Sequence, residues 1–341
     1  MKVAREQEIS QIEIGKPHVV ILGAGASKAS FPHGDRNGKK LPLMDDFIDV
    51  LELAPLLDKT DVEYKSRNFE EIYADLYGRR EYASICRELE ILIYRYFSEL
   101  KITDVPCRYD HLILSLREKD VIATFNWDPF LMQAYLRNKR RYKKLPELLF
   151  LHGNVAVGVC LRHRERGING NLCSRCRKPY MPTKLFYPVL QKNYHDEPDI
   201  ADQWSRLDEY LKDALLVTIF GYGAPASDWD ARKLLKKGWG EPLDRRLEQI
   251  EIIDRKDKDR DALRKTWKSF IHAEHYDIRS DFYDSWIADY PRRTGEAFYN
   301  QYIRNSWEGC LEKNPIPAKA GFEELWVWFD VLYKNEFKHN N

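Results

Sequence analysis

Short runs of apolar residues recur along the chain, and helical patterns lie between them. Each run is too short for a typical helix and has the length of a buried strand. The runs are HVVILG at 18–23, VIATFN at 121–126, LLFLHG at 148–153, LLVTIFG at 215–221 and QIEIIDR at 249–255. The clearest helical pattern spans 81–99, where Ile85, Leu89, Leu92 and Tyr96 recur at helical spacing. Strands that alternate with helices predict an α/β fold with a doubly wound, Rossmann-like parallel sheet.

The spacing of the predicted strands is uneven, which indicates inserted segments. We expect a mostly helical insertion at about 40–105 and a second, cysteine-bearing insertion at about 158–185, both beside the main sheet. Aromatic residues become frequent in the last part of the chain. We therefore predict a sheet-containing domain at 1–256 and a C-terminal helical, aromatic-rich extension at 257–341.

The last helical pattern of the extension has one apolar face. Trp326, Phe329, Leu332 and Tyr333 share that face. Such a helix must bury its apolar face, either on the body of the protein or on a partner. Packing on the body is the simpler of the two alternatives.

Charge and hydropathy narrow the functional classes. The 341 residues hold 55 Lys and Arg against 54 Asp and Glu, a net charge of +1. This balance gives no overall field that attracts nucleic acid or an anionic membrane, so we expect no direct binding to either. No segment approaches the ~20 apolar residues of a membrane helix. The N-terminal residues lack the apolar core of an export signal, so we expect a cytoplasmic protein.

Two short motifs predict a metal site in the second insertion. Cys160 and His163 form one pair and Cys173 and Cys176 the other, at a spacing that suits one tetrahedral zinc ion. Four protein ligands would close the site, so the zinc would be structural. The alternative is free thiols with His163 on the surface. The remaining cysteines, Cys86, Cys107 and Cys310, are interpreted as buried apolar residues.

A glycine turn follows the first predicted strand. It reads Gly23-Ala24-Gly25-Ala26-Ser27 and leads into a predicted helix. Glycines let the backbone approach a phosphate, and the start of a helix presents free N–H groups. The third glycine of the dinucleotide fingerprint is missing, so the turn alone leaves phosphate binding and plain loop geometry open.

Polar residues follow the second and third strands. Thr124, Asn126 and Asp128 come after one strand, and His152 ends the other. Open parallel sheets bind ligands at the carboxyl ends of their strands, where these residues are expected to gather. The alternative is that Asp128 caps the next helix and Asn126 satisfies its own turn.

The fourth and fifth strands end in a further turn and an acid. Gly221, Tyr222 and Gly223 form the turn, and Asp254 ends the fifth strand. An acid at this position suits ribose hydroxyls, and the turn suits another part of a dinucleotide. Loop architecture explains both features nearly as well.

Taken in order, these segments resemble the sirtuin family over residues 17–256. The matching segments are GAGAS, TFNWD, LHGN, the two cysteine motifs, GYG and IEIIDR. The resemblance implies NAD+ as the bound nucleotide. It also implies NAD+-binding roles for the glycine turn at 23–27, for Thr124, Asn126 and Asp128, for the turn at 221–223 and for Asp254.

One segment departs from the protein-deacylating sirtuins. Residues 28–47 read KASFPHGDRNGKKLPLMDDF, without the G-I-P-D-F-R stretch that helps to form their nicotinamide pocket. The PLMDDF segment and the G-Y-x5-D-x-D stretch at 221–230 resemble instead the sirtuin-like effectors of bacterial anti-phage systems, which hydrolyse NAD+. The resemblance therefore implies an NAD+ hydrolase that depletes NAD+ during infection.

For this hydrolase we expect Asn126 to position water and the ribose, His152 to act as general base and Asp128 to orient the pair. The alternatives are an NAD-dependent protein deacylase and a catalytically silent module that senses NAD+ or ADP-ribose. Unrestrained hydrolysis would kill the host, so we expect a homo-oligomer or a complex with a defence partner such as a HerA-type ATPase. Residues 257–341 are the candidate contact surface.

Overall fold

The computed structural model describes residues 3–65, 67–189, 192–255, 257–304 and 311–337. Its centre is a six-stranded sheet with the strand order β3-β2-β1-β7-β8-β9, in which all neighbours are parallel. The strands are β1 (His18–Leu22), β2 (Val121–Thr124), β3 (Glu147–Phe150), β7 (Leu216–Phe220), β8 (Gln249–Ile253) and β9 (Tyr276–Arg279). The predicted α/β class with a parallel, doubly wound sheet is confirmed, and each of the five predicted strands is present.

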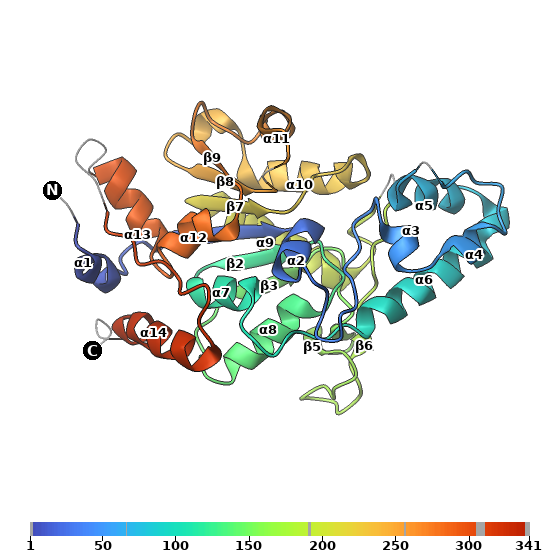
Figure 1. Cartoon of the computed structure of the whole chain (residues 1–341), viewed down its shortest axis with the longest axis horizontal. Coiled ribbons are helices and arrows are strands. Elements are labelled where there is room, and N and C mark those ends of the chain that lie inside the picture. The colour runs from blue at the N-terminus through green and yellow to red at the C-terminus, as the bar shows by residue number, and fades with distance from the viewer. Residues whose placement is uncertain (1–2, 66, 190–191, 256, 305–310, 338–341) are drawn as a thin grey trace.

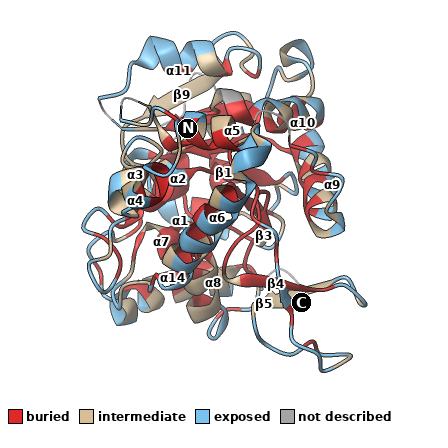
Figure 2. Cartoon of the chain, turned by 90° about the vertical axis from the view of Figure 1, so that its right-hand side faces the viewer, coloured by how far each residue is buried: buried red, intermediate tan, exposed pale blue. Residues whose placement is uncertain are grey.

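Both faces of the sheet are covered, which explains why its strands read as continuous apolar runs. In β1, Val20 and Leu22 join the core on one face, whereas Val19 and Ile21 join the core on the other. Helices α7 (Arg108–Ser115) and α8 (Phe130–Lys139) contribute to the first core. Helices α9 (Pro198–Asp213) and α10 (Trp229–Trp239) contribute to the second. Figure 2 shows the buried residues gathered on the strands and on the inward faces of the helices.

The sixth strand, β9, lies within 257–341, the segment that we expected to be a helical extension. It pairs with β8 at the edge of the sheet. All four of its residues are half-buried, because an edge strand is packed less completely than a central one. Its short YDIR sequence therefore has no apolar run that predicts a strand, and the sheet continues past residue 256.

The helical insertion is present and lies beside the sheet (Figure 1). It contains α3 (Phe47–Val50), α4 (Ala54–Leu57), α5 (Phe69–Tyr77) and α6 (Ala83–Ser98). The predicted helix at 81–99 is confirmed as α6, but its predicted inward face is wrong by one position. Cys86, Leu89, Ile93 and Phe97 are the buried residues, and Leu92 is exposed. Two overlapping apolar stripes run along α6, and packing on the rest of the insertion selects one of them.

The cysteine-bearing insertion folds as a small three-stranded sheet. Its strands are β4 (Val157–Cys160), β5 (Glu165–Ile168) and β6 (Met181–Pro182), and β4 is central and antiparallel to both neighbours. Outside this sheet, Cys86 and Cys107 are buried as expected, and Cys310 lies outside the described residues. The other helices are α1 (Arg5–Ser10), α2 (Ala24–Ser30), α11 (Arg260–Trp267), α12 (Trp286–Asp289), α13 (Thr294–Phe298) and α14 (Phe322–Asn335).

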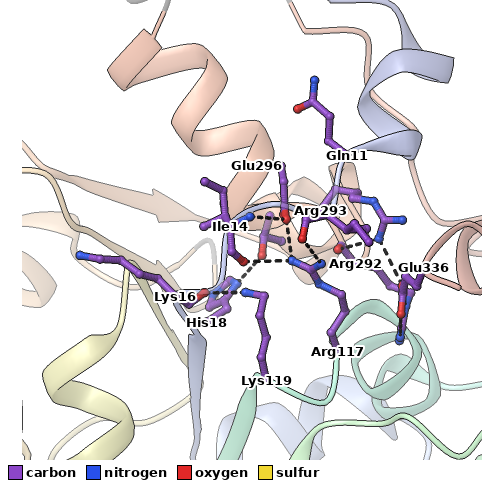
Figure 3. A network of polar contacts seen from close by, with 12 residues as sticks. Gln11, Ile14, Lys16, His18, Arg117, Lys119, Arg292, Arg293, Glu296 and Glu336 are labelled. Carbon is purple, nitrogen blue, oxygen red and sulfur yellow. Dashed lines mark hydrogen bonds and ion pairs between the residues drawn. The ribbon is translucent and has the colours of Figure 1, made fainter. Parts of the chain in front are cut away.

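Helix α14 packs on the body of the protein, which was the simpler of the two alternatives. Its Phe329 lies within the main core. Buried polar contacts also tie the C-terminal segment to the body (Figure 3). Arg117 donates from Nη2 to Glu296 Oε1 at 2.7 Å, and Arg292 donates from Nη1 to the carbonyl of Leu116 at 2.6 Å. Within the segment, Arg292 also donates from Nη2 to Glu336 Oε2 at 2.6 Å. These contacts lie near the start of β1, at the end of the sheet opposite to the strand ends that we predicted to bind ligands.

Among the described residues, no helix combines the length and the apolar character needed to cross a membrane.

Candidate functional site

The carboxyl ends of the parallel strands open into one cavity of about 530 Å³. This volume lies within the usual range for ligand sites, about 300–1,000 Å³. The predicted residues that line it are Gly23, Ala24, Gly25, Ser27, Asn126, Asp128, His152, Gly221, Tyr222, Gly223 and Asp254. Ala26 and Thr124 are buried behind this lining. The structure therefore brings the three catalytic candidates and both glycine turns to one place.

The two glycine turns touch each other at this cavity. Gly25 donates its N–H to the carbonyl oxygen of Gly221 at 3.0 Å. A Cβ atom at Gly23 would lie 2.5 Å from the same oxygen. Gly221 has a φ of +62°, and its Cβ would lie 2.2 Å from the backbone nitrogen of Ala26. The close approach of the two turns therefore requires these glycines, independently of any bound phosphate.

The side chain of Asn126 is held from several sides. Its Nδ2 lies 2.9 Å from the carbonyl of Gly23, 3.0 Å from Ser27 Oγ and 3.2 Å from Tyr109 Oη. A carbonyl only accepts, so the Gly23 contact fixes which end of the amide is nitrogen. In the described part of the chain no donor is bonded to Asn126 Oδ1. That oxygen is the atom that can accept a hydrogen bond from a hydroxyl group or water in the cavity.

Asp128 acts on Asn126 through a serine. Ser27 Oγ donates its proton to Asp128 Oδ2 at 2.6 Å. The lone pairs of Ser27 Oγ are then available to accept a hydrogen bond from Asn126 Nδ2. Asp128 Oδ1 also accepts the N–H of Phe130, the first residue of α8, at 3.2 Å, although the N-cap residue of that helix is Pro129. Burial raises the pKa of the Asp128 carboxyl to about 6, and the Ser27 hydrogen bond opposes this rise. Asp128 therefore orients one member of the expected pair, Asn126.

His152 is buried at the end of β3 and is held by other groups. Its Nε2 lies 2.7 Å from Tyr194 Oη and 3.8 Å from Asp228 Oδ1. The ring of Phe125 meets the imidazole edge-on, with centroids 4.7 Å apart. Burial lowers the pKa of His152 to about 3, although the charge of Asp228 acts in the opposite direction. The imidazole is therefore neutral near pH 7 and can accept a proton, but at this pKa it is a weak base in the resting site.

Sequence reasoning missed three residues around His152. They are Lys192, Tyr194 and Asp228, all buried. Asp228 stands in a stretch with a recognisable pattern, G-Y-x5-D-x-D, but that pattern does not say that its carboxylate faces a histidine. Lys192 and Tyr194 lie in an irregular segment without periodicity. Only the folded chain brings them to His152.

Residues from both flanking segments complete the cavity wall. Met44, Asp45 and Phe47 come from the helical insertion, and Asp281 and Phe282 come from the segment after β9. Residues beyond 256 therefore contribute to the same cavity as the predicted sheet domain.

The four predicted zinc ligands also come together. The ligand atoms of Cys160, His163, Cys173 and Cys176 all lie within 4.8 Å of one another. His163 Nδ1 is 3.3 Å from Cys173 Sγ, and Cys160 Sγ is 3.6 Å from Cys176 Sγ. Tetrahedral zinc with Zn–S near 2.3 Å and Zn–N near 2.0 Å separates its ligand atoms by about 3.5–3.8 Å. The distances and donor set fit structural zinc, and the sulfur atoms are too far apart for a disulfide.

A second cavity of about 800 Å³ lies beside the first. It is lined by α5, by α6 and by residues from 183–189 and 192–196, with Tyr73, Glu90 and Tyr94 among its residues. Phe186 and Lys192 line both cavities. The two spaces therefore share a wall directly beside His152.

No protein-family model and no curated protein sequence matches the chain. Among solved structures, the chain is similar to a Sir2 homologue in complex with NAD, with 13% identity, a TM-score of 0.37 and coverage of 88% of this chain and 93% of that chain. It is also similar to a Sir2 homologue variant in complex with 2'-O-acetyl ADP ribose, with 14% identity, a TM-score of 0.39 and coverage of 87% and 94%. These identities and TM-scores are low, so the fold class is assigned from the strand order of the sheet itself.

Proposed function

We propose that this chain is an NAD+ glycohydrolase of the sirtuin type. The observation that carries the proposal is the cavity that Asn126 and His152 line together with two contacting glycine turns. The order of the motifs along the chain is what points to NAD+, and the cavity has the size of a ligand site. The products would be nicotinamide and ADP-ribose.

The reaction breaks the bond between the nicotinamide nitrogen and the ribose C1' carbon. The bonding electrons pass to the cationic nicotinamide, which leaves neutral, and C1' gains oxocarbenium character. Asn126 Oδ1 accepts a hydrogen bond from a ribose hydroxyl or from water, because its Nδ2 is already engaged. The water oxygen then bonds to C1', and its proton passes to neutral His152, directly or through a ribose hydroxyl.

The zinc site is part of the proposal only as a structural element. Cys160, His163, Cys173 and Cys176 would hold the ion. Bound zinc supplies a covalent cross-link of the small sheet and no open coordination position for chemistry.

Product analysis without any acylated peptide tests the hydrolase. Purified protein is incubated with NAD+, and nicotinamide and ADP-ribose are separated by chromatography. Equal amounts of the two products support hydrolysis. Nicotinamide release that occurs only with an acyl-peptide contradicts hydrolysis and supports a protein deacylase.

The deacylase is the second candidate, and one observation favours it. The 800 Å³ cavity shares Phe186 and Lys192 with the proposed NAD+ cavity, so a modified lysine side chain has a space close to the reaction centre. Such a substrate would attack C1' with its acyl oxygen in place of water. The product analysis above separates the two reactions.

The biological part of the proposal is defence by NAD+ depletion, restrained until the chain assembles. A homo-oligomer or a partner such as a HerA-type ATPase would bind through 257–341, where α14 exposes Val327 and Val331. Turnover should therefore rise with protein concentration or on addition of the partner. High turnover by a dilute monomer would contradict this restraint.

A further inference from the structure

A buried ion pair lies beside His152, and the mechanism above does not use it. Lys192 Nζ is bonded to Asp228 Oδ1 and donates to the carbonyl of Ser227 at 3.1 Å. Tyr222 Oη donates to the second carboxylate oxygen of Asp228 at 3.0 Å. The side chains of Lys192 and Asp228 are 2% and 7% exposed. A buried ion pair of this kind contributes little net stability on its own, so its position next to His152 requires another explanation.

The pair is arranged around the imidazole. Asp228 Oδ1, the oxygen bonded to Lys192, is also the one 3.8 Å from His152 Nε2. Tyr194 Oη lies 2.7 Å from the same nitrogen. The rings of Phe125 and Phe186 pack against the imidazole from other sides. The charged and titratable groups facing His152 are therefore Asp228, Tyr194 and, through Asp228, Lys192 and Tyr222.

We propose that Asp228 is a positioning residue for His152, and that Lys192 keeps the Asp228 carboxylate ionised in the resting site. The inference rests on the proposed function and deepens it. The sequence suggests that Asp128 orients the histidine. We assign that role to Asp228, whereas Asp128 orients Asn126 through Ser27.

The proposed role follows from the charges at each stage. In the resting site, the ammonium of Lys192 balances the carboxylate, and the imidazole is neutral. When His152 takes the proton of the attacking water, an imidazolium forms next to a carboxylate that is already in place. Burial alone would raise the pKa of the Asp228 carboxyl, and in the resting site, where His152 is neutral, the charge and the hydrogen bond of Lys192 oppose that rise. Asp228 is therefore available as an anion when the proton arrives.

Paired substitutions separate this role from a structural one. Lys192→Met or Asp228→Asn alone leaves one buried charge without its partner, so both single variants should melt at lower temperature. The double variant, Lys192→Met with Asp228→Asn, removes both charges and nearly keeps the shape. The matched control is the surface pair of Lys212 and Asp208 on α9, changed to Met and Asn.

The double variant should regain much of the melting temperature that the single variants lose, yet its NAD+ turnover should stay about 100-fold or more below wild type. The control variant at Lys212 and Asp208 should keep the melting temperature and the NAD+ turnover of wild type. If the double variant recovers turnover together with melting temperature, the ion pair is structural and the proposal is contradicted.

A second readout does not depend on turnover. The nitrogen resonances of the His152 ring are followed against pH in Lys192→Met and in the double variant. Without Lys192, the His152–Asp228 pair should take up a proton at higher pH, and Asp228→Asn should abolish that response. Coinciding curves for the two variants would contradict the proposal. If wild type never cleaves NAD+, the proposed function fails, and this titration still decides whether Asp228 acts on His152.

Discussion

The N–H of Gly25 donates to the carbonyl oxygen of Gly221 at 3.0 Å, and this bond joins the turn after β1 to the turn after β7. The strands that carry the two turns are neighbours in the sheet, although they lie far apart in the chain. The contact places both turns on one cavity, with Asn126 bonded to the first of them.

Gly221→Ala should destabilise the protein more than Gly38→Ala. Both glycines have a positive φ, so each alanine has an unfavourable backbone conformation worth about 1–2 kcal/mol. A Cβ at Gly38 meets nothing within 4 Å, whereas a Cβ at Gly221 collides with the backbone of Gly25 and Ala26. Urea unfolding of both variants measures the difference. Equal losses of unfolding free energy in the two variants would show that the close contact of the turns does not contribute to stability.

Ser27→Ala should reduce NAD+ turnover by about 10-fold or more, because it breaks the link between Asp128 and Asn126. Ser30→Ala is the matched control on the same helix, since the Ser30 hydroxyl donates to the carbonyl of Ala26 within that helix. Steady-state rates of the two variants provide the comparison. A Ser27→Ala enzyme as active as the Ser30→Ala enzyme would rule out this link.

His152→Gln should make the folded protein less sensitive to acid. The pKa of His152 is lowered from 6.5 to about 3, so folding favours the neutral ring. The stability that this gives is complete above pH 6.5 and is lost as the pH falls toward 3. Between pH 7 and pH 5 the wild type should lose about 2 kcal/mol more than His152→Gln. Urea unfolding at the two pH values measures this, and parallel losses would contradict a neutral, buried His152.

The purified protein should contain one zinc ion per chain. Cys173→Ser should weaken zinc binding by about 10-fold or more and lower the melting temperature, because it removes one of four ligands. Cys86→Ala, at a buried cysteine in α6, is the control and should keep its zinc. Elemental analysis of both proteins measures the metal content. Full zinc content in Cys173→Ser would exclude the four-ligand site.

The central strands could be predicted because burial on both faces leaves a continuous apolar run. The same reason explains the failure at β9, whose four residues are half-buried at the sheet edge. Helix α6 was predicted correctly as a helix, but Leu92 was placed inward and is exposed. Periodicity identifies a helix, whereas the choice between two neighbouring apolar stripes depends on tertiary packing.

The cavity could be predicted in outline because the carboxyl ends of parallel strands meet at one edge. That rule is enough to place Asn126 and His152 at the same cavity, where the folded chain has them. No comparable rule places Lys192 and Tyr194, because these residues lie in an irregular segment and not at the end of a strand. Asp228, the partner of His152, lies in the turn after β7, and its sequence pattern does not say that its carboxylate faces the histidine.

The most direct test of the proposed hydrolase is NAD+ consumption by wild type beside His152→Ala, Asn126→Ala and His195→Ala. His195 is an exposed histidine close in sequence to Tyr194 and serves as the control. We predict equal amounts of nicotinamide and ADP-ribose from wild type and from His195→Ala. His152→Ala should be slower by about 10²–10⁴-fold, which corresponds to ~3–5 kcal/mol of transition-state stabilisation. Near wild-type turnover by His152→Ala would contradict the assignment of this cavity as the hydrolase site.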